Sequence, residues 1–175
     1  MSITRLSLSF LLIFFLILPT ISVLSSPGLV VIVSNSIDIE AARQLNKALL
    51  KNGVSCFILR SDELWKMEHY PVDTLIILGG PQAYEGIGEM VANYLTEEEE
   101  ASLMEEGAMG FFVKFKEGKR IIILAGNTRN ETKEAVTYFF EKILSVLKTP
   151  ISEGIKANVI MVVVGTEPSS TPVGG

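Results

Sequence analysis

The chain of 175 residues has little of what usually performs catalysis or crosslinks a fold, because it contains one cysteine and one histidine. A single cysteine forms no internal disulfide, so we expect packing to hold the fold and interpret Cys56 as a buried apolar side chain. His69 has no partner at metal-ligand spacing. No Ser/His/acid, Cys/His or metal set can be assembled, and we expect no catalytic residue, no metal and no cofactor.

Positive charge and the glycine motifs of nucleotide binding are scarce too. The chain has 15 Lys and Arg against 20 Asp and Glu, a formal net charge of −5. Neither Gly-x-Gly-x-x-Gly nor the lysine of a phosphate-binding loop is present. A negatively charged chain cannot neutralise a phosphate backbone, so we expect no nucleic-acid partner.

Apolar residues are abundant, and the first long run of them lies near the N-terminus. Residues 10–18 contain only Phe, Leu and Ile. Arg5 lies before them, and the small Ser25 follows, with a tolerable Val23 two residues before it. This three-part pattern predicts a secretory signal peptide over residues 1–25 and an extracellular or cell-surface location. An uncleaved membrane anchor stays open, since residues 6–24 almost suffice to span a bilayer.

The rest of the chain has the length of one domain. We predict a single α/β domain over residues 26–165. Residues 166–175 are rich in Ser, Thr, Pro and Gly. Such a composition buries too little to pack, so we expect a flexible tail there.

Two apolar runs of strand length end in glycine turns. They are residues 73–81, Asp-Thr-Leu-Ile-Ile-Leu-Gly-Gly-Pro, and residues 120–127, Arg-Ile-Ile-Ile-Leu-Ala-Gly-Asn. Continuous runs of this kind are typical of parallel strands covered on both faces. The full set of predicted strands is 29–33, 54–59, 72–78, 110–115, 120–124 and 157–164.

Helical patterns separate these strands. Residues 61–68 form a weak pattern with Trp65 on the inner side, and a capping box at 96–99 starts a helix whose four glutamates we expect in solvent rather than on calcium. Residues 128–148 form the longest predicted helix. Two more are predicted, one between Ser36 and Asn52-Gly53 and one over residues 86–94.

The alternation of strands and helices predicts a three-layer α/β sandwich with a mostly parallel, doubly wound (flavodoxin/Rossmann-like) sheet. Right-handed crossovers give the order second, first, third, then the 120–124 strand. The short link before Arg120 permits only an antiparallel hairpin, with the 110–115 strand at the edge. The 157–164 strand could join either edge.

Three strand ends collect at one edge of this predicted sheet. The candidate ligand-binding residues there are Ser34, Asn35, Gly79, Gly80, Gly126, Asn127 and Thr128. Backbone amides at the two helix starts could hold an anion. We favour the simpler interpretation, in which the glycines permit the tight turns that such a sheet requires.

One triplet, Asn130-Glu131-Thr132, is a glycosylation acceptor. It lies in the first turn of an amphipathic helix, which places Asn130 at the surface. We therefore expect a glycan to be sterically possible at this residue.

Two segments resemble those of a known class of proteins. They are Ile76-Ile77-Leu78-Gly79-Gly80-Pro81, followed by Val91 and Leu95, and residues 122–132 with Ala135 after them. They are similar to the α/β modules of archaeal S-layer and S-layer-like cell-surface proteins, and the likeness covers residues 29–147. Those proteins also begin with a signal peptide. The resemblance implies a cell-envelope domain that contacts other cell-surface proteins or copies of itself.

These observations lead to two functional hypotheses. The first is a secreted or surface-held, non-enzymatic α/β domain of the cell envelope that acts through protein contacts and meets the membrane only through an uncleaved signal segment. The alternative is an extracytoplasmic small-ligand-binding protein or hydrolase that uses the glycine-containing edge. An acid and a nucleophile converging on that edge would favour the alternative.

Overall fold

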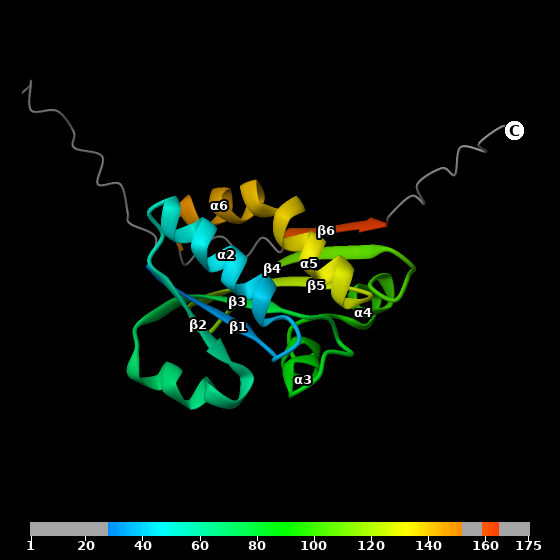
Figure 1. Ribbon diagram of the computed structural model, residues 1–175, viewed down its shortest axis with the longest axis horizontal. Helices are drawn as coiled ribbons and strands as arrows, with labels where there is room; N and C mark the ends of the chain where they lie inside the picture. Colours follow the sequence, from blue (N-terminus) through cyan, green and yellow to red (C-terminus); the bar gives the residue numbers. More distant parts are fainter. Residues whose placement is uncertain (1–27, 152–158, 165–175) are drawn as a thin grey trace, which may run out of the picture.

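The computed structural model describes residues 28–151 and 159–164, so the predicted signal peptide and tail lie outside the described residues. The chain has an α/β fold built on one mixed sheet with strand order β2-β1-β3-β5-β4-β6 (Figure 1). The elements in chain order are β1 (Leu29–Ser34), α2 (Ile39–Lys51), β2 (Cys56–Arg60), the 3₁₀ helix η1 (Ser61–His69), β3 (Val72–Leu78), α3 (Ile87–Ala92), α4 (Glu97–Ser102), β4 (Ala108–Lys116), β5 (Lys119–Gly126), α5 (Arg129–Tyr138), α6 (Phe140–Lys148) and β6 (Val159–Val164).

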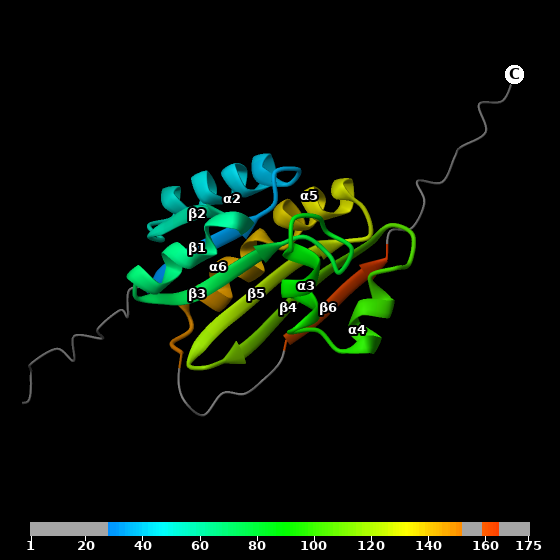
Figure 2. The same ribbon diagram turned by 90° about the horizontal axis from the view of Figure 1, so that it is seen from below.

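The order of the four parallel strands, β2-β1-β3-β5, confirms the prediction from right-handed crossovers. The hairpin of β4 and β5 is antiparallel, as the short link between them requires. The prediction that β4 lies at the edge was wrong, because β6 pairs with it in antiparallel orientation (Figure 2). The 157–164 strand, for which the sequence left either edge open, thus joins the sheet beside β4, with Phe111 opposite Met161.

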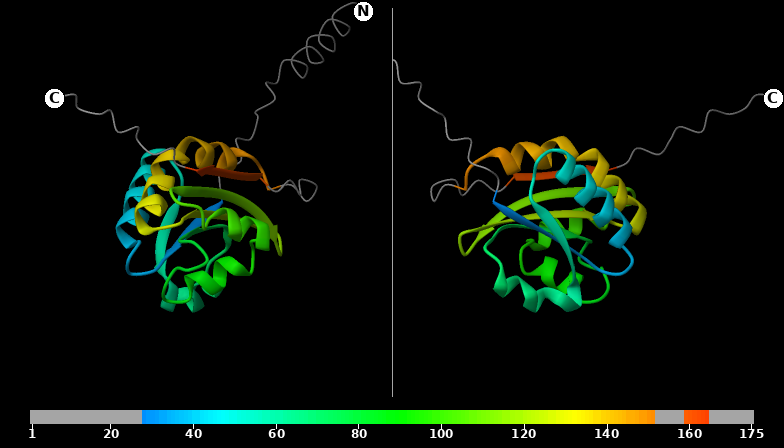
Figure 3. Two further views of the ribbon diagram at one scale, coloured as in Figure 1. Left: turned by 90° about the vertical axis from the view of Figure 1, so that its right-hand side faces the viewer. Right: turned by 60° about the vertical axis from the view of Figure 1, so that its left-hand side comes forward.

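Helices cover both faces of the sheet. Alternate residues of the strands face opposite sides, so Val30 and Ile32 join one apolar core while Val31 and Val33 join the other. The first core packs under α2, α5 and α6, and the second packs against η1, α3 and α4 (Figure 3).

The predicted place of Trp65 on the inner side of its helix was wrong, because its side chain is 61% exposed. Residues 61–69 form a 3₁₀ helix, in which positions three apart share a face. Leu64 and Met67 hold this spacing and pack against the second core. Trp65 lies between them in sequence and therefore points to solvent.

The predicted long helix over residues 128–148 bends at Phe139, whose φ and ψ are −93° and 7°. This leaves α2, with 13 residues, as the longest helix of the described chain. Phe139 is fully buried and stacks on Phe111 of β4, with ring centroids 5.5 Å apart. The bend keeps the apolar sides of α5 and α6 on the same core.

The four glutamates at the start of α4 are not all in solvent, which corrects a further prediction. The capping box is present, since the Thr96 side chain accepts from Glu99 N and the Glu99 carboxylate accepts from Thr96 N. Glu99 is buried, and both of its oxygens lie within hydrogen-bond distance of Lys114. Glu97 and Glu98 are exposed, as predicted.

Candidate ligand-binding pocket

A pocket of about 260 Å³ lies at the carboxyl ends of β1, β3 and β5. This is where parallel α/β sheets bind their ligands. Six of the seven predicted residues line it: Asn35, Gly79, Gly80, Gly126, Asn127 and Thr128. Ser34 does not line it and is fully buried beneath. The other lining residues are Ile37, Asp38, Pro81, Gln82, Ala83, Tyr84, Leu103, Met104, Arg129 and Thr132.

Two of the glycines are required by the backbone. Gly79 has a φ of +134°, and a Cβ there would lie 2.8 Å from Cγ2 of Ile87. A Cβ on Gly126 would lie 2.4 Å from the backbone nitrogen of Thr132, so glycine lets the start of α5 approach the end of β5. The preferred structural interpretation of these glycines therefore agrees with their geometry, while the same residues form part of the pocket wall.

Backbone amides at both helix starts are already bonded within the protein. Asp38 N donates to Oδ1 of Asn35 at 2.7 Å, ahead of α2. At α5, Thr128 N donates to Oε2 of Glu131 at 3.0 Å, and Asn130 N donates to the Thr128 hydroxyl at 3.2 Å. These bonds use amides that an anion would need, which counts against an anion site made from helix starts.

Asp38 is the acid of the pocket lining, and the sequence analysis did not include it among the candidate residues. Its side chain lines the pocket but is only 6% exposed, and its Oδ1 has no hydrogen-bond partner in the described part of the chain. Burial raises the pKa of this carboxyl, while hydrogen bonding from Asn35 and the positive charge of Arg129 lower it in part.

The sequence signal for Asp38 was ambiguous. An acid at this position suits a helix start, which is a sufficient explanation by itself. Its place in the turn between the first strand and the first helix, three residues after Asn35, is the feature that could have marked it.

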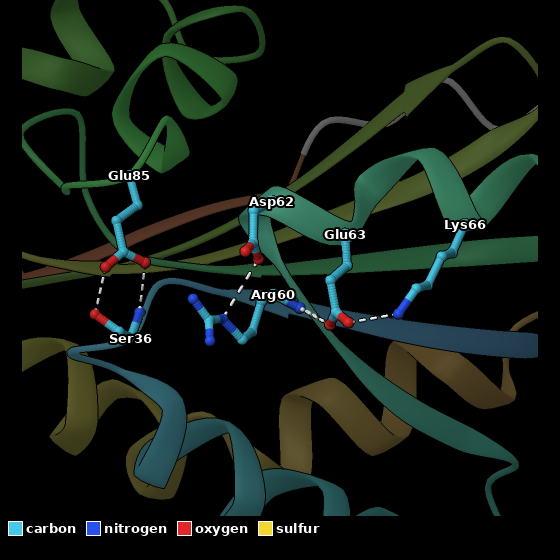
Figure 4. Close-up of polar contacts among 6 residues, drawn as sticks. All are labelled: Ser36, Arg60, Asp62, Glu63, Lys66 and Glu85. Atoms are coloured by element: carbon cyan, nitrogen blue, oxygen red, sulfur yellow. Dashed lines mark hydrogen bonds and ion pairs between the residues drawn. The ribbon is translucent and has the colours of Figure 1, made fainter.

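A polar contact joins the two loops beside the pocket. Glu85, with a φ of 58°, follows the lining residue Tyr84, and Ser36 precedes Ile37. Ser36 N donates to Oε2 of Glu85 at 2.8 Å, and the Ser36 hydroxyl donates to Oε1 (Figure 4). These bonds, with a smaller effect from the charge of Arg60, lower the pKa of Glu85.

The neighbouring contacts in Figure 4 hold the start of η1. Arg60 N donates to Oε2 of Glu63 at 3.2 Å, and Lys66 Nζ lies 2.5 Å from Oε1 of the same carboxylate. Arg60 Nε lies 3.4 Å from Oδ1 of Asp62. The direct passage from β2 into η1 is therefore held by these hydrogen bonds and charge pairs near the surface.

Cys56 and His69 lie away from the pocket lining. Burial raises the pKa of the Cys56 thiol to about 11, which keeps it protonated and unreactive near neutral pH. His69 ends η1, with its ring edge-on to Trp65 at a centroid distance of 6.2 Å. Within residues 28–151 and 159–164, no three side chains of His, Cys, Asp or Glu gather as metal ligands would.

Asn130 is exposed in the first turn of α5, the position predicted for the glycosylation acceptor. Its neighbours Thr128 and Arg129 line the pocket. A glycan on Asn130 would therefore stand close to the pocket opening.

None of the protein-family models searched matches this chain, and no curated protein matches it either. Within the two described segments, no helix combines the length and apolar character needed to cross a membrane. The class that the coordinates establish is an α/β protein with a mixed six-stranded sheet, parallel from β2 to β5 and antiparallel at β4 and β6.

Proposed function

We propose that this chain is an exported α/β domain of the cell envelope that binds a small polar molecule in the pocket at the ends of β1, β3 and β5. The observation that carries the proposal is the Asp38 carboxylate, which is buried in the pocket wall with one oxygen unpaired. A pocket of about 260 Å³ is smaller than those that hold drug-sized ligands, roughly 300 to 1,000 Å³, so the molecule is small.

The energetic argument starts from the cost of that unpaired oxygen. A buried acceptor without a hydrogen bond destabilises a fold by about 1–3 kcal/mol, and by more when it is charged. A ligand that donates a hydrogen bond to Asp38 removes this cost. Such a ligand would bind the folded chain selectively and stabilise it.

Binding is favoured over hydrolysis because three hydroxyls beside the pocket, on Ser36, Thr128 and Thr132, are already engaged. The Ser36 hydroxyl donates to Glu85, the Thr128 hydroxyl donates to Glu131, and the Thr132 hydroxyl donates to Thr128 O at 3.1 Å. None of these oxygens is paired with a general base that faces the pocket. A hydrolase would need an acid and an activated nucleophile at this edge. Asp38 supplies the acid, but none of these three hydroxyls is an activated nucleophile.

Export, a cell-surface location and the S-layer-like character of the chain rest on the sequence pattern of residues 1–25 and on the resemblance over residues 29–147. The finer fold class, a three-layer, doubly wound sandwich of flavodoxin/Rossmann-like type, belongs to the same proposal. It is supported by the helices on both faces and by the crossover order β2-β1-β3.

A second candidate function is contact with other cell-surface proteins or copies of itself. One feature favours it: η1 and the residue after it expose Trp65 and Tyr70, at 61% and 49%. Exposed aromatic side chains are enriched at protein interfaces. Crosslinking on intact cells, compared between wild type and Trp65→Ala, tests this second function. The same crosslinked products in both would show that the two aromatic side chains do not form the contact surface.

Ligand-observed NMR with a library of small polar fragments tests the binding proposal on the full chain. We expect fragments that bind wild type and lose their signal with Asp38→Asn. Asp73→Asn is the matched control, because Asp73 lies at the amino end of β3, where its carboxylate accepts from Leu29 N at 3.1 Å. A library without any fragment sensitive to Asp38→Asn would refute a binding role for this pocket.

A further inference from the structure

The pocket lining contains two charged residues, and they have opposite signs. Asp38 precedes α2 and is buried, whereas Arg129 is the first residue of α5 and is exposed. Their charges interact, since Arg129 lowers the pKa of Asp38, but the two side chains form no ion pair in the described part of the chain. Among the residues that the structure describes, the pocket therefore has one unpaired acceptor in its wall and one exposed cation that forms no ion pair.

From this arrangement, and given the binding function proposed above, we infer that the ligand is a small zwitterion of the amino-acid class. Its ammonium group donates to Asp38, and its anionic group binds Arg129. Its short apolar part contacts Ile37, Leu103 and Met104, which line the same pocket. This inference rests on the proposed function and specifies the chemistry of the site.

The partner of Asp38 is an organic cation rather than a metal ion. Calcium takes six to eight oxygen ligands, usually with several carboxylates among them, and magnesium is bound through one or two carboxylates together with waters or substrate phosphates. Asp38 is the only acid among the lining residues of this pocket. An ammonium group needs one carboxylate and a few further acceptors, and the Asn127 side-chain amide in the lining offers one.

The anionic end of the ligand is assigned to Arg129 because backbone amides of the helix starts are engaged. Asn35, Glu131 and Thr128 accept from them, as described above. A guanidinium group binds a carboxylate through two parallel hydrogen bonds. The exposed Arg129 side chain can adopt that geometry without breaking an ion pair of its own in the described residues.

Three probes of nearly equal shape separate the two ends of the ligand. They are L-leucine, 3-methylbutylammonium, which lacks the carboxylate, and 4-methylpentanoate, which lacks the ammonium. Titration calorimetry on the full chain should give the highest affinity for L-leucine, by about tenfold or more over each one-charge probe, because each charged end adds a charge-assisted hydrogen bond.

Two substitutions test the assignment of each end. Asp38→Asn should lower the affinity for L-leucine and for 3-methylbutylammonium by about tenfold or more. The affinity for 4-methylpentanoate should not change. Arg129→Gln should weaken the binding of L-leucine and of 4-methylpentanoate. The affinity for 3-methylbutylammonium should stay unchanged or rise slightly. Arg129 is exposed, so this variant folds even if Asp38→Asn does not. Asp73→Asn should change none of the three affinities.

The possible failures are distinguishable. If 4-methylpentanoate binds as tightly as L-leucine and its affinity is unchanged by Asp38→Asn, the site is an anion site and the inference is wrong. If none of the three probes binds while other fragments bind in an Asp38-dependent way, the zwitterion is wrong and the binding function stands. If no fragment binds in an Asp38-dependent way, both the zwitterion inference and the proposed binding function are wrong.

Discussion

Lys114 of β4 and Glu99 of α4 form a buried ion pair, with Nζ 2.5 Å from Oε1 and 2.8 Å from Oε2. Their side chains are 10% and 7% exposed. Lys114 faces the same side of the sheet as Phe112, so its ammonium lies beneath α4 instead of reaching solvent. This pair fixes α4 to the antiparallel part of the sheet.

Removing one partner of this pair should destabilise the fold strongly, because the remaining charge stays buried. We expect Lys114→Met to lower the free energy of unfolding by about 3 kcal/mol in urea denaturation. Adding Glu99→Gln, which removes the unpaired charge and keeps a side-chain oxygen that can accept from Thr96 N, should recover most of that loss. Glu40→Gln, which breaks the exposed pair of Glu40 and Arg43, is the control and should change stability by less than about 0.5 kcal/mol. A small effect of Lys114→Met would show that the Glu99 carboxylate left behind reaches water.

The contact between Ser36 and Glu85 should make stability depend on pH. The folded state lowers the pKa of Glu85, so its contribution is present above the pKa of the unfolded chain and is lost as the pH falls through the folded value. The melting temperature of wild type should therefore fall more steeply below about pH 4.5 than that of Glu85→Gln.

Glu89→Gln is the matched control for this prediction, because Glu89 is an exposed glutamate a few residues along the chain. It should follow the wild-type curve. Parallel curves for wild type and Glu85→Gln would mean that Glu85 does not hold the two loops together.

Gly126→Ala should be among the most destabilising small substitutions of the chain. The added Cβ would lie 2.4 Å from a backbone nitrogen of α5, which cannot move without shifting the helix. We expect a loss of about 2 kcal/mol or more in thermal or urea unfolding. Gly118→Ala is the control, since a Cβ there meets nothing within 4 Å and only the positive φ of 74° is strained. Its loss should be about 1 kcal/mol. Equal losses would contradict the close approach of α5.

The Cys56 thiol should react slowly with iodoacetamide in the folded protein. Its pKa of about 11 leaves little thiolate at pH 7.5, and the rate should rise about tenfold per pH unit toward that value. The unfolded chain in urea provides the control and should react faster at neutral pH. A rate that levels off near pH 8 would disprove the burial effect.

Amino-terminal sequencing of the native protein tests the export part of the proposal. We expect the mature chain to begin at Ser26, since small residues follow the apolar run up to Ser25. A chain that still begins near Met1 would make it an anchored protein rather than a secreted one.

Local sequence patterns determined much of this fold. Each predicted strand has a counterpart in the described structure, because apolar, β-branched runs of five to eight residues suit strands buried on both faces. The handedness of crossovers and the short link before β5 then determined the order β2-β1-β3-β5 and the hairpin. The positions of Asn35, Gly79, Gly126 and Thr128 in one pocket follow from the same rule, since parallel strands end at one edge.

Only the tertiary structure decided which polar side chains are buried and what they meet. Asp38 and Glu99 both have the sequence signature of an acid in the first turn of a helix, and such acids are usually exposed. Asp38 is buried because the turn after β3 and the start of α5 close around it. Glu99 is buried against Lys114, a residue of β4 that lies 15 positions further along the chain. Burial depends on segments that are distant in the chain, so neither helical periodicity nor capping rules could separate these two acids from their solvated neighbours.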